Sequence, residues 1–166
     1  MTGSAVLSPC GLYRYRLERR LSSSDRIACF VMLNPSTADA SNDDPTIRRC
    51  KGFAQAWACG RLVVVNLFAF RATKPADMKR ADDPVGPDND AHIARAALEV
   101  SRSGGHLVCA WGAHGKIKDR GRKVLADLLA QDGAAPCSLD LTADGMPRHP
   151  LYLRGDLLPV PYRGAP

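Results

Sequence analysis

The sequence has no long hydrophobic run: nothing in its 166 residues approaches the roughly 20 consecutive apolar residues of a membrane-spanning helix. The first ten residues, MTGSAVLSPC, have neither the basic start nor the long apolar middle of a secretory signal. These absences argue against a membrane protein and against export. We therefore expect a protein that stays in the cytoplasm and has no membrane partner.

Paired cysteines and clustered histidines are also missing. The six cysteines are scattered without any CxxC pair, and the four histidines, His92, His106, His114 and His149, have no close metal-ligand spacing. This pattern favours reduced thiols that pack as small hydrophobic residues over disulfides, a zinc site or an iron–sulfur cluster. We therefore expect neither a metal nor another cofactor.

Three sequence motifs of common enzyme classes are absent as well. No GxGxxG run and no GxxxxGK followed by Ser or Thr appears, so a dinucleotide site or a P-loop would lack its phosphate-binding loop. No GxSxG is present to form the nucleophile turn of an α/β hydrolase. These absences weigh against phosphoryl transfer and against serine hydrolysis.

The composition that remains is that of an ordinary globular protein. Hydrophobic residues make up 45% and charged residues 24%, and the length suits one domain over residues 1–166. The formal net charge of +6 makes a polyanionic partner such as DNA plausible. The basic residues are spread along the chain, so a solvated basic surface remains an alternative explanation.

Continuous apolar runs are typical of strands that are buried on both faces. They lie at residues 26–33, 61–70 and 106–112. Alternation of apolar and charged residues over 12–21 predicts an exposed or edge strand, and 136–141 predicts a short strand. We expect residues 1–10 and 160–166 to be loosely held tails.

Helices are expected between these strands. Residues 44–60 have signals at both ends, because Asp44 can cap the helix, Pro45 fits its first position and Gly60 can end it. The other predicted elements are a Pro- and Asp-rich loop after residue 70, a helix at 87–105 closed by Gly104 and Gly105, a helix in the second half of 116–133, and a loop at 142–153. Alternating strands and helices predict an α/β domain with a mainly parallel sheet covered on both faces.

Polar residues lie at the ends of four of the predicted strands. They are Asn34 to Thr37, Asn66, Trp111 to His114, and Arg148 to Tyr152. In parallel α/β sheets, ligands bind at the carboxyl ends of the strands. We therefore expect these four segments to converge on one cleft.

Four motifs that carry these residues occur in a fixed order. They are MLNPST, VVVNLFAFRAT, VCAWGAHGKIKDRGRKVL and GMPRHPLYL. Together, over about residues 26–154, they resemble the uracil-DNA glycosylase superfamily, and most of all a small bacterial branch of unknown function. The resemblance implies a three-layer α/β/α sandwich with a mainly parallel central sheet. It also implies a monomeric DNA glycosylase of base excision repair that hydrolyses the N-glycosidic bond of uracil, or of a related modified pyrimidine, in DNA.

The resemblance also implies roles for individual residues. Asn34 would orient water, Asn66 would hydrogen-bond to O4 and N3–H of uracil, and His149 would stabilise the departing base. Each of these side chains has a structural alternative: a turn at Asn34, backbone satisfaction at Asn66, and packing of a Pro-rich loop at His149. A carboxylate could instead come from one of three aspartates, Asp39, Asp43 or Asp44.

The remaining residues implied by the resemblance surround the base and the DNA. Those expected to contact the base are Leu33, Pro35, Ser36 and Phe68. The aromatic residue that stacks on the base stays open among Phe53, Phe68 and Phe70, and Trp111 is expected in the core. Those expected to contact DNA are Leu151, Tyr152 and Leu153, as apolar wedges, and Arg148, Lys116 and Arg71, at phosphates.

Two other functions remain open at this point. The first is a nucleic-acid or nucleotide-binding module of the same fold that has no catalytic activity, for which binding should depend on salt. The second is a hydrolase that acts on a free nucleoside or on another small glycoside. The modest net charge of the chain is compatible with either alternative.

Overall fold

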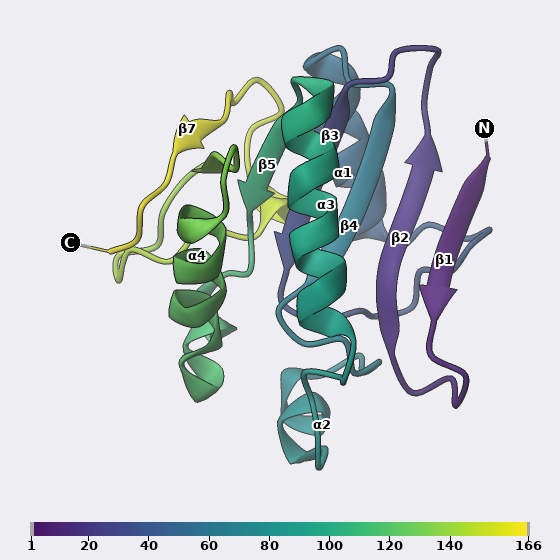
Figure 1. Cartoon of the computed structure of the whole chain (residues 1–166), viewed down its shortest axis with the longest axis vertical. Coiled ribbons are helices and arrows are strands. Elements are labelled where there is room, and N and C mark those ends of the chain that lie inside the picture. The colour runs from purple at the N-terminus through teal and green to yellow at the C-terminus, as the bar shows by residue number, and fades with distance from the viewer. Residues whose placement is uncertain (1, 166) are drawn as a thin grey trace.

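The computed structural model describes residues 2–165 and contains a seven-stranded sheet in the order β1-β2-β4-β3-β5-β6-β7 (Figure 1). The strands are β1 (Gly3–Leu7), β2 (Arg14–Arg20), β3 (Ile27–Met32), β4 (Arg61–Asn66), β5 (His106–Cys109), β6 (Pro136–Ser138) and β7 (Val160–Pro161). The four central strands, β4, β3, β5 and β6, are parallel, whereas β1, β2 and β7 pair in antiparallel fashion. The domain is therefore α/β, as predicted, with a mixed sheet.

Helices connect the parallel strands. They are α1 (Pro45–Ala56), α2 (Pro75–Arg80), α3 (Asn89–Ser103) and α4 (Arg120–Ala130), with 3-10 turns η1 (Ala113–Asp119) and η2 (Pro150–Tyr152). Helix α2 lies in the segment predicted as a Pro- and Asp-rich loop, where Pro75 begins a single short helix. Within residues 2–165, no helix has the length and apolar character needed to cross a membrane.

The ends of two helices follow their sequence signals closely. Asp44 caps α1 by accepting a hydrogen bond of 2.9 Å from the Ile47 backbone, and Gly104 ends α3 in the left-handed conformation, with φ of 67°. Gly60 does not end α1, which stops at Ala56. A Cβ atom at Gly60 would lie 2.0 Å from the Ser24 carbonyl oxygen, so glycine is needed there for a close backbone approach.

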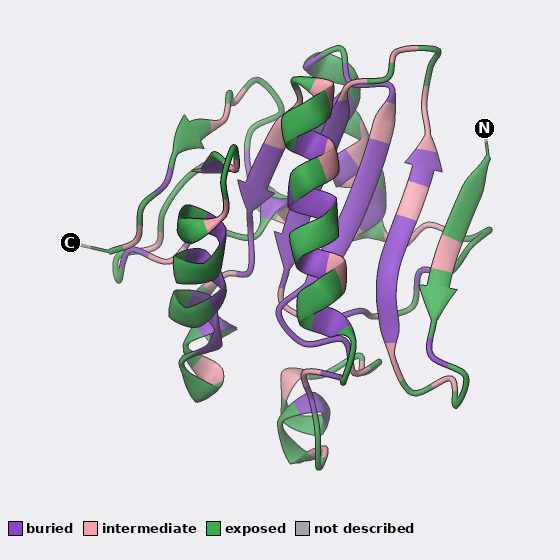
Figure 2. Ribbon diagram, in the orientation of Figure 1, coloured by how far each residue is buried: buried purple, intermediate pink, exposed green. Residues whose placement is uncertain are grey.

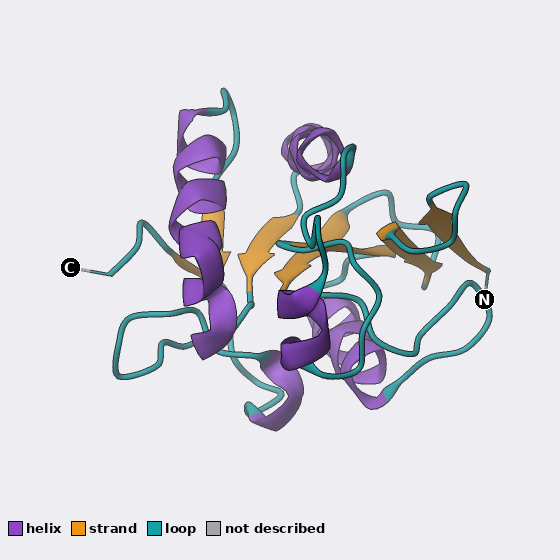
Figure 3. Ribbon diagram, turned by 90° about the horizontal axis from the view of Figure 1, so that it is seen from below, coloured by secondary structure: helices purple, strands orange, loops and turns teal. Residues whose placement is uncertain are grey.

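Strand β3 is buried on both faces (Figure 2). Ile27, Cys29 and Val31 pack in one apolar cluster with residues of α3 and α4. The alternate residues Ala28, Phe30 and Met32 pack in a second cluster with residues of α1. Helices thus cover both sides of the sheet, as the view along the strands also shows (Figure 3).

All six cysteines are free thiols, and four of them, Cys29, Cys50, Cys59 and Cys109, are buried. Burial raises the pKa of the Cys29 thiol to about 12. These cysteines therefore pack as small hydrophobic residues, as predicted from their spacing.

Both predicted tails are wrong. Residues 3–7 form β1, which pairs with β2 along its whole length, and residues 160–161 form β7, which pairs with β6. The buried Tyr162 follows β7 and donates a hydrogen bond of 3.0 Å to the Gly145 carbonyl. Because β1 occupies the edge, β2 is an interior and mostly buried strand, and the prediction of an exposed or edge strand at 12–21 is also wrong.

Strand β2 contains a β-bulge at Tyr15. Val6 of β1 lies opposite Arg16 and Leu7 lies opposite Arg14, so Tyr15 is an extra residue. Tyr15 and Arg16 both face α3, where they contact His92 and Glu99. The bulge thereby turns Arg14 to the opposite face of the sheet.

Candidate functional site

A cleft of about 350 Å³ lies at the carboxyl edge of the parallel strands. Its lining includes Asn34 after β3, Asn66 at the end of β4, His114 after β5 and His149 in the loop after β6. One residue from each of the four predicted strand ends thus reaches the same cleft. In the sheet, β4 lies on one side of β3 and β5 lies on the other, although both follow β3 in the chain. Ligands of α/β sheets bind where the strand order reverses in this way.

The segments after β3 and β4 continue side by side beyond the strands. The Leu67 and Phe68 backbone N–H groups donate to the Met32 and Leu33 carbonyls at 2.9 and 3.0 Å, and Ala72 donates to Pro35 at 3.2 Å. This pairing fixes the turn that presents Asn34. The local sequence after β3 therefore forms an ordered wall of the cleft.

Asn34 has a fixed amide orientation. Its Nδ2 donates to the Ala72 carbonyl at 2.8 Å and to the Pro35 carbonyl at 3.1 Å. Because both partners are acceptors, the nitrogen must face them and Oδ1 must face away. Among residues 2–165, nothing donates a hydrogen bond to Oδ1, which stays available as an acceptor.

Asn66 is a buried amide whose nitrogen lacks a partner. The side chain lines the cleft, is only 1% exposed, and its Nδ2 has no hydrogen-bond acceptor among residues 2–165. A buried donor left without a partner costs about 1–3 kcal/mol. The structural alternative, in which this amide satisfies the strand backbone, therefore does not describe Asn66; the neighbouring Asn89 has that role, since its Nδ2 donates to the Asn66 and Leu67 carbonyls.

His149 lies at the rim of the cleft in a defined tautomer. Its Nδ1 accepts a hydrogen bond of 3.2 Å from the Leu151 backbone, so the proton of the neutral ring is on Nε2. Partial desolvation lowers the pKa of His149 below its usual 6.5, although nearby Asp44 opposes the shift. At neutral pH the ring is thus a neutral N–H donor.

The backbone conformation at position 112 favours glycine, and the loop of His149 packs beside it. Gly112 has φ of 72°, and its N–H donates to the Pro147 carbonyl at 2.7 Å. A Cβ atom there would lie 3.8 Å from Cβ of His149. The tryptophan-glycine pair after β5 therefore supports the loop that carries the histidine, while Trp111 itself is buried in the core, as predicted, and also lines the cleft.

Only one of the three aspartates considered as a source of a carboxylate reaches the cleft. Asp39 accepts hydrogen bonds from Ser41 and Asn42 within its own exposed turn. Asp43 forms ion pairs with Arg19 and Lys51, at 2.8 Å each. Asp44 lines the cleft, and its cap bond uses Oδ1 alone, so Oδ2 remains free to face a ligand.

Arg14 is a lining residue that the sequence pattern did not reveal. Alternation along residues 12–21 places it on the same face as Arg16, and only the bulge turns it toward the cleft. Its Nη1 donates to the Ala38 carbonyl in the loop before α1. No local signal in the sequence marks a bulge at Tyr15, because none of the neighbouring residues is a glycine or a proline.

The predicted base-contacting residues separate into two groups. Leu33 and Ser36 line the cleft. Pro35 is buried beside it, and Phe68 is fully buried in the core without lining it, so a contact between Phe68 and a bound base is not supported. Phe53, on the buried face of α1, is likewise in the core and does not line the cleft.

The predicted DNA-contacting residues do not line the cleft themselves. Tyr152 is 89% exposed and Leu151 is partly exposed, whereas Leu153 is buried in the core and is not free to enter a base stack. Arg148 and Lys116 are exposed but pair with Asp140 and Asp144. Arg71 is exposed and donates to the Gly11 carbonyl at 3.2 Å.

No group of three or more metal-ligating side chains occurs in the part of the chain that the structure describes, residues 2–165. The chemical groups of the cleft are two amides, two imidazoles, one carboxylate, one guanidinium and the indole of Trp111, together with the hydroxyl groups of Ser36, Thr46 and Thr73. These groups can orient water, donate hydrogen bonds to carbonyl oxygens and neutralise an anion.

Comparisons with known proteins give one match. A family model described as a protein of unknown function, DUF1643, matches residues 14–151. No curated protein and no solved structure matches the chain. The matched range begins at Arg14 and includes every residue of the cleft lining.

Proposed function

The chain belongs to the DUF1643 family, and we propose that it is a DNA glycosylase that hydrolyses the N-glycosidic bond of uracil, or of a related modified pyrimidine, in DNA. The observation that carries this proposal is that Asn34, Asn66 and His149 line one cleft at the carboxyl edge of the sheet. In each of these side chains, the atoms that base recognition and hydrolysis require have no hydrogen-bond partner among residues 2–165.

The proposal includes a uracil-DNA glycosylase-like fold, that is, a three-layer α/β/α sandwich. Helices on both faces of the sheet and four consecutive parallel strands are compatible with that architecture. The sequence motifs that resemble the superfamily also lie at the cleft. The antiparallel strands β1, β2 and β7 would be additions at the edges of the sheet.

Base recognition is assigned to Asn66. Its unpaired Nδ2 would donate to uracil O4, and Oδ1 would accept from N3–H, which removes the cost of a buried unpaired donor. Cytosine presents the opposite polarity at both positions, and such a mismatch costs about 1–3 kcal/mol. The cleft would thus prefer uracil over the normal base.

Hydrolysis would proceed by departure of the base followed by addition of water. The bond between C1′ and the base nitrogen breaks, its electron pair leaves with the base, and Nε2–H of His149 stabilises the charge on O2. Water, held by Oδ1 of Asn34, adds its oxygen to C1′ and releases one proton. An amide cannot accept that proton, so the free Oδ2 of Asp44 would receive it.

Access to a base in duplex DNA requires that the nucleotide leave the stack, at a cost of a few kcal/mol. Tyr152 and Leu151, which follow His149 in the chain, would occupy the vacated space, since Tyr152 is 89% exposed. Arg71, Arg148 and Lys116 would bind backbone phosphates, which positions the protein without selecting a sequence. Arg148 and Lys116 would first have to exchange their aspartate partners for phosphate.

The proposal is tested by incubating the purified protein with single- and double-stranded oligonucleotides that contain one uracil, followed by alkali to cleave abasic sites. We expect strand cleavage at uracil, reduced about 100-fold or more in Asn34→Ala and in His149→Ala. Asn42→Ala is the matched control, because Asn42 lies in the same loop but bonds to Asp39 outside the cleft. Intact product from both substrates would refute the proposal.

The same experiment separates the alternative functions. Free deoxyuridine is included as a substrate, because a cleft of about 350 Å³ is within the size range of small-ligand sites. Uracil release from deoxyuridine alone would indicate a nucleoside hydrolase. Salt-dependent binding of the oligonucleotide without any base release would indicate a binding module.

A further inference from the structure

Four arginines are buried in the described part of the chain, residues 2–165, and one of them differs from the other three. Arg16 pairs with Glu18 and Glu99, Arg19 with Asp43, and Arg120 with Asp90. Arg14 is only 3% exposed, and no carboxylate among residues 2–165 lies within ion-pair distance of it. A buried charge without a partner is costly, so its retention calls for an explanation.

The guanidinium of Arg14 has one edge free. Nη1 donates to the Ala38 carbonyl, whereas Nε is fully buried without a partner, and Nη2 donates to nothing within residues 2–165. Nε–H and Nη2–H lie parallel on the same edge of a guanidinium and form the fork that binds two oxygens of one phosphate or carboxylate. The free edge is therefore the edge that recognises an oxyanion.

Arg14 is charged and close to the other groups of the cleft. Burial lowers the pKa of Arg14 to about 10, although Asp44 acts in the opposite direction. The guanidinium is thus still charged at neutral pH. Asp44 lines the same cleft but forms no ion pair with Arg14, so the guanidinium has no direct carboxylate partner there.

The direction of Arg14 is built into the fold at two places. The bulge at Tyr15 turns the side chain to the cleft face, and the antiparallel direction of β2 brings its first residues to the carboxyl edge of β4. The Arg14 backbone N–H donates to the Ala69 carbonyl at 2.9 Å just beyond that edge. Bulges that re-aim a side chain are common next to functional sites.

We propose that Arg14 binds a phosphate group of the nucleotide whose base occupies the cleft. In the proposed complex, Asn66 and His149 hydrogen-bond to the polar edge of the base. The unpaired edge of Arg14 is then available to an anionic group of the same ligand. The chain has no glycine-rich phosphate loop, and Arg14 is the one guanidinium in the cleft lining among residues 2–165, so we assign this contact to its side chain. This inference rests on the proposed function only for the identity of the base; the phosphate could belong to a DNA strand or to a free nucleotide.

The test measures binding by calorimetry with deoxyuridine, deoxyuridine 5′-monophosphate, inorganic phosphate and a short single-stranded oligonucleotide containing uracil. We expect the unaltered protein to bind a phosphate-bearing probe at least tenfold more tightly than deoxyuridine. Arg14→Met should remove that advantage and leave the affinity for deoxyuridine unchanged, because the methyl thioether fills similar space without charge. Arg20→Met, on the same strand but paired with Asp25 outside the cleft, should bind as the unaltered protein does.

Arg14→Lys keeps the proposal testable if Arg14→Met does not fold. Lysine keeps the charge but lacks the two parallel N–H groups, so it should retain only part of the advantage. If substitution of Arg14 removes the affinity advantage only for the monophosphate, the ligand is a free nucleotide. If it removes the advantage only for the oligonucleotide, the ligand is a DNA phosphodiester. If it removes both, Arg14 binds a phosphate in either setting. The proposal would be overturned if deoxyuridine, the monophosphate and the oligonucleotide bound with equal affinity, or if the advantage survived in Arg14→Met.

The outcome is independent of base release. If no uracil is excised but the phosphate advantage depends on Arg14, the proposed function fails and the phosphate site stands. If uracil is excised and Arg14→Met binds every probe as the unaltered protein does, only the phosphate site fails. The two readouts, alkali-labile strands and binding affinity, are measured separately.

Discussion

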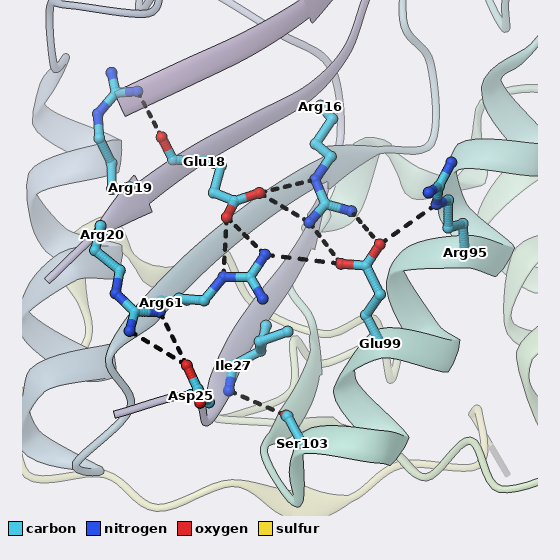
Figure 4. A network of polar contacts seen from close by, with 10 residues as sticks. All are labelled: Arg16, Glu18, Arg19, Arg20, Asp25, Ile27, Arg61, Arg95, Glu99 and Ser103. Atoms are coloured by element: carbon cyan, nitrogen blue, oxygen red, sulfur yellow. Dashed lines mark hydrogen bonds and ion pairs between the residues drawn. The ribbon is translucent and has the colours of Figure 1, made fainter. Parts of the chain in front are cut away.

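Arg14 and Arg16 lie two residues apart on β2, yet their surroundings are opposite. Arg16 belongs to a network in which Glu18 and Glu99 accept hydrogen bonds from Arg16 at 2.9 and 2.7 Å, and Glu18 also accepts from Arg61 at 2.7 Å (Figure 4). Arg14 has one carbonyl partner and no carboxylate. The β-bulge at Tyr15 separates the two residues by placing them on different faces of the sheet.

The difference indicates which polar groups serve the fold and which await a ligand. In the network around Arg16, charges of both signs pair and join β2, β4 and α3. In the cleft, Arg14 and Asn66 keep buried donors without acceptors. Paired groups should therefore matter for stability, and the unpaired groups that line the cleft for binding and activity.

The largest effect is expected where an unpaired amide is removed. Asn66→Leu keeps the size of the side chain but removes its polar atoms, so we expect kcat/KM for uracil release to fall about 100-fold while Tm does not fall. Asn89→Ala is the matched change at an amide whose nitrogen is paired. It removes the Nδ2 donor to the Asn66 carbonyl and one of two side-chain donors to the Leu67 carbonyl, which keeps its bond from Arg120. We therefore expect the free energy of unfolding to fall by about 2 kcal/mol. A large loss of stability in Asn66→Leu would break the comparison.

A smaller effect is expected in the paired network. Glu99→Gln removes the charge that Arg16 contacts from α3, but Glu18 remains as its partner. We expect the free energy of unfolding to fall by about 1–2 kcal/mol and Tm by about 2–8 °C, with unchanged kcat/KM for uracil release. Urea unfolding measures the change in stability, and the alkali assay measures uracil release. A variant that lost activity but kept its full stability would contradict the prediction.

The smallest effect is expected from pH. Desolvation lowers the pKa of His92, His106 and His149 below 6.5, so the unfolded chain takes up protons first as the pH falls. Their contribution to stability is complete above about pH 6.5 and is lost below it. In the network, burial raises the pKa of Glu18, but hydrogen bonds from Arg61 and Arg16 lower it overall, so these pairs stay charged over the same range.

Melting curves between about pH 7.5 and about pH 5 measure this effect. Tm should fall slightly as the pH is lowered, and less in His149→Gln than in the unaltered protein. The Nδ1 bond from Leu151 is lost on protonation, so the loop of His149 should also become more mobile. Identical pH dependence in both proteins would show that His149 has an ordinary pKa.

Much of the site could be predicted because it follows directly from strand ends. The apolar run before Asn34 and the run that ends at Asn66 place both amides at the carboxyl edge, and capping residues place the start of α1 at Asp44. The choice among the three aspartates could not be predicted. It depends on Arg19 of β2, which pairs with Asp43 and leaves Asp44 to line the cleft.

The sequence by itself determined the alternation of strands and helices, the burial of β3, and the convergence of Asn34, Asn66 and His149 on one cleft. These features depend on hydrophobic period and local capping, which are encoded in adjacent residues. Only the tertiary structure decided that residues 3–7 cover the edge of β2 and that Arg14 faces the cleft. Both depend on strand pairing and a bulge, which are fixed by contacts between segments far apart in the chain.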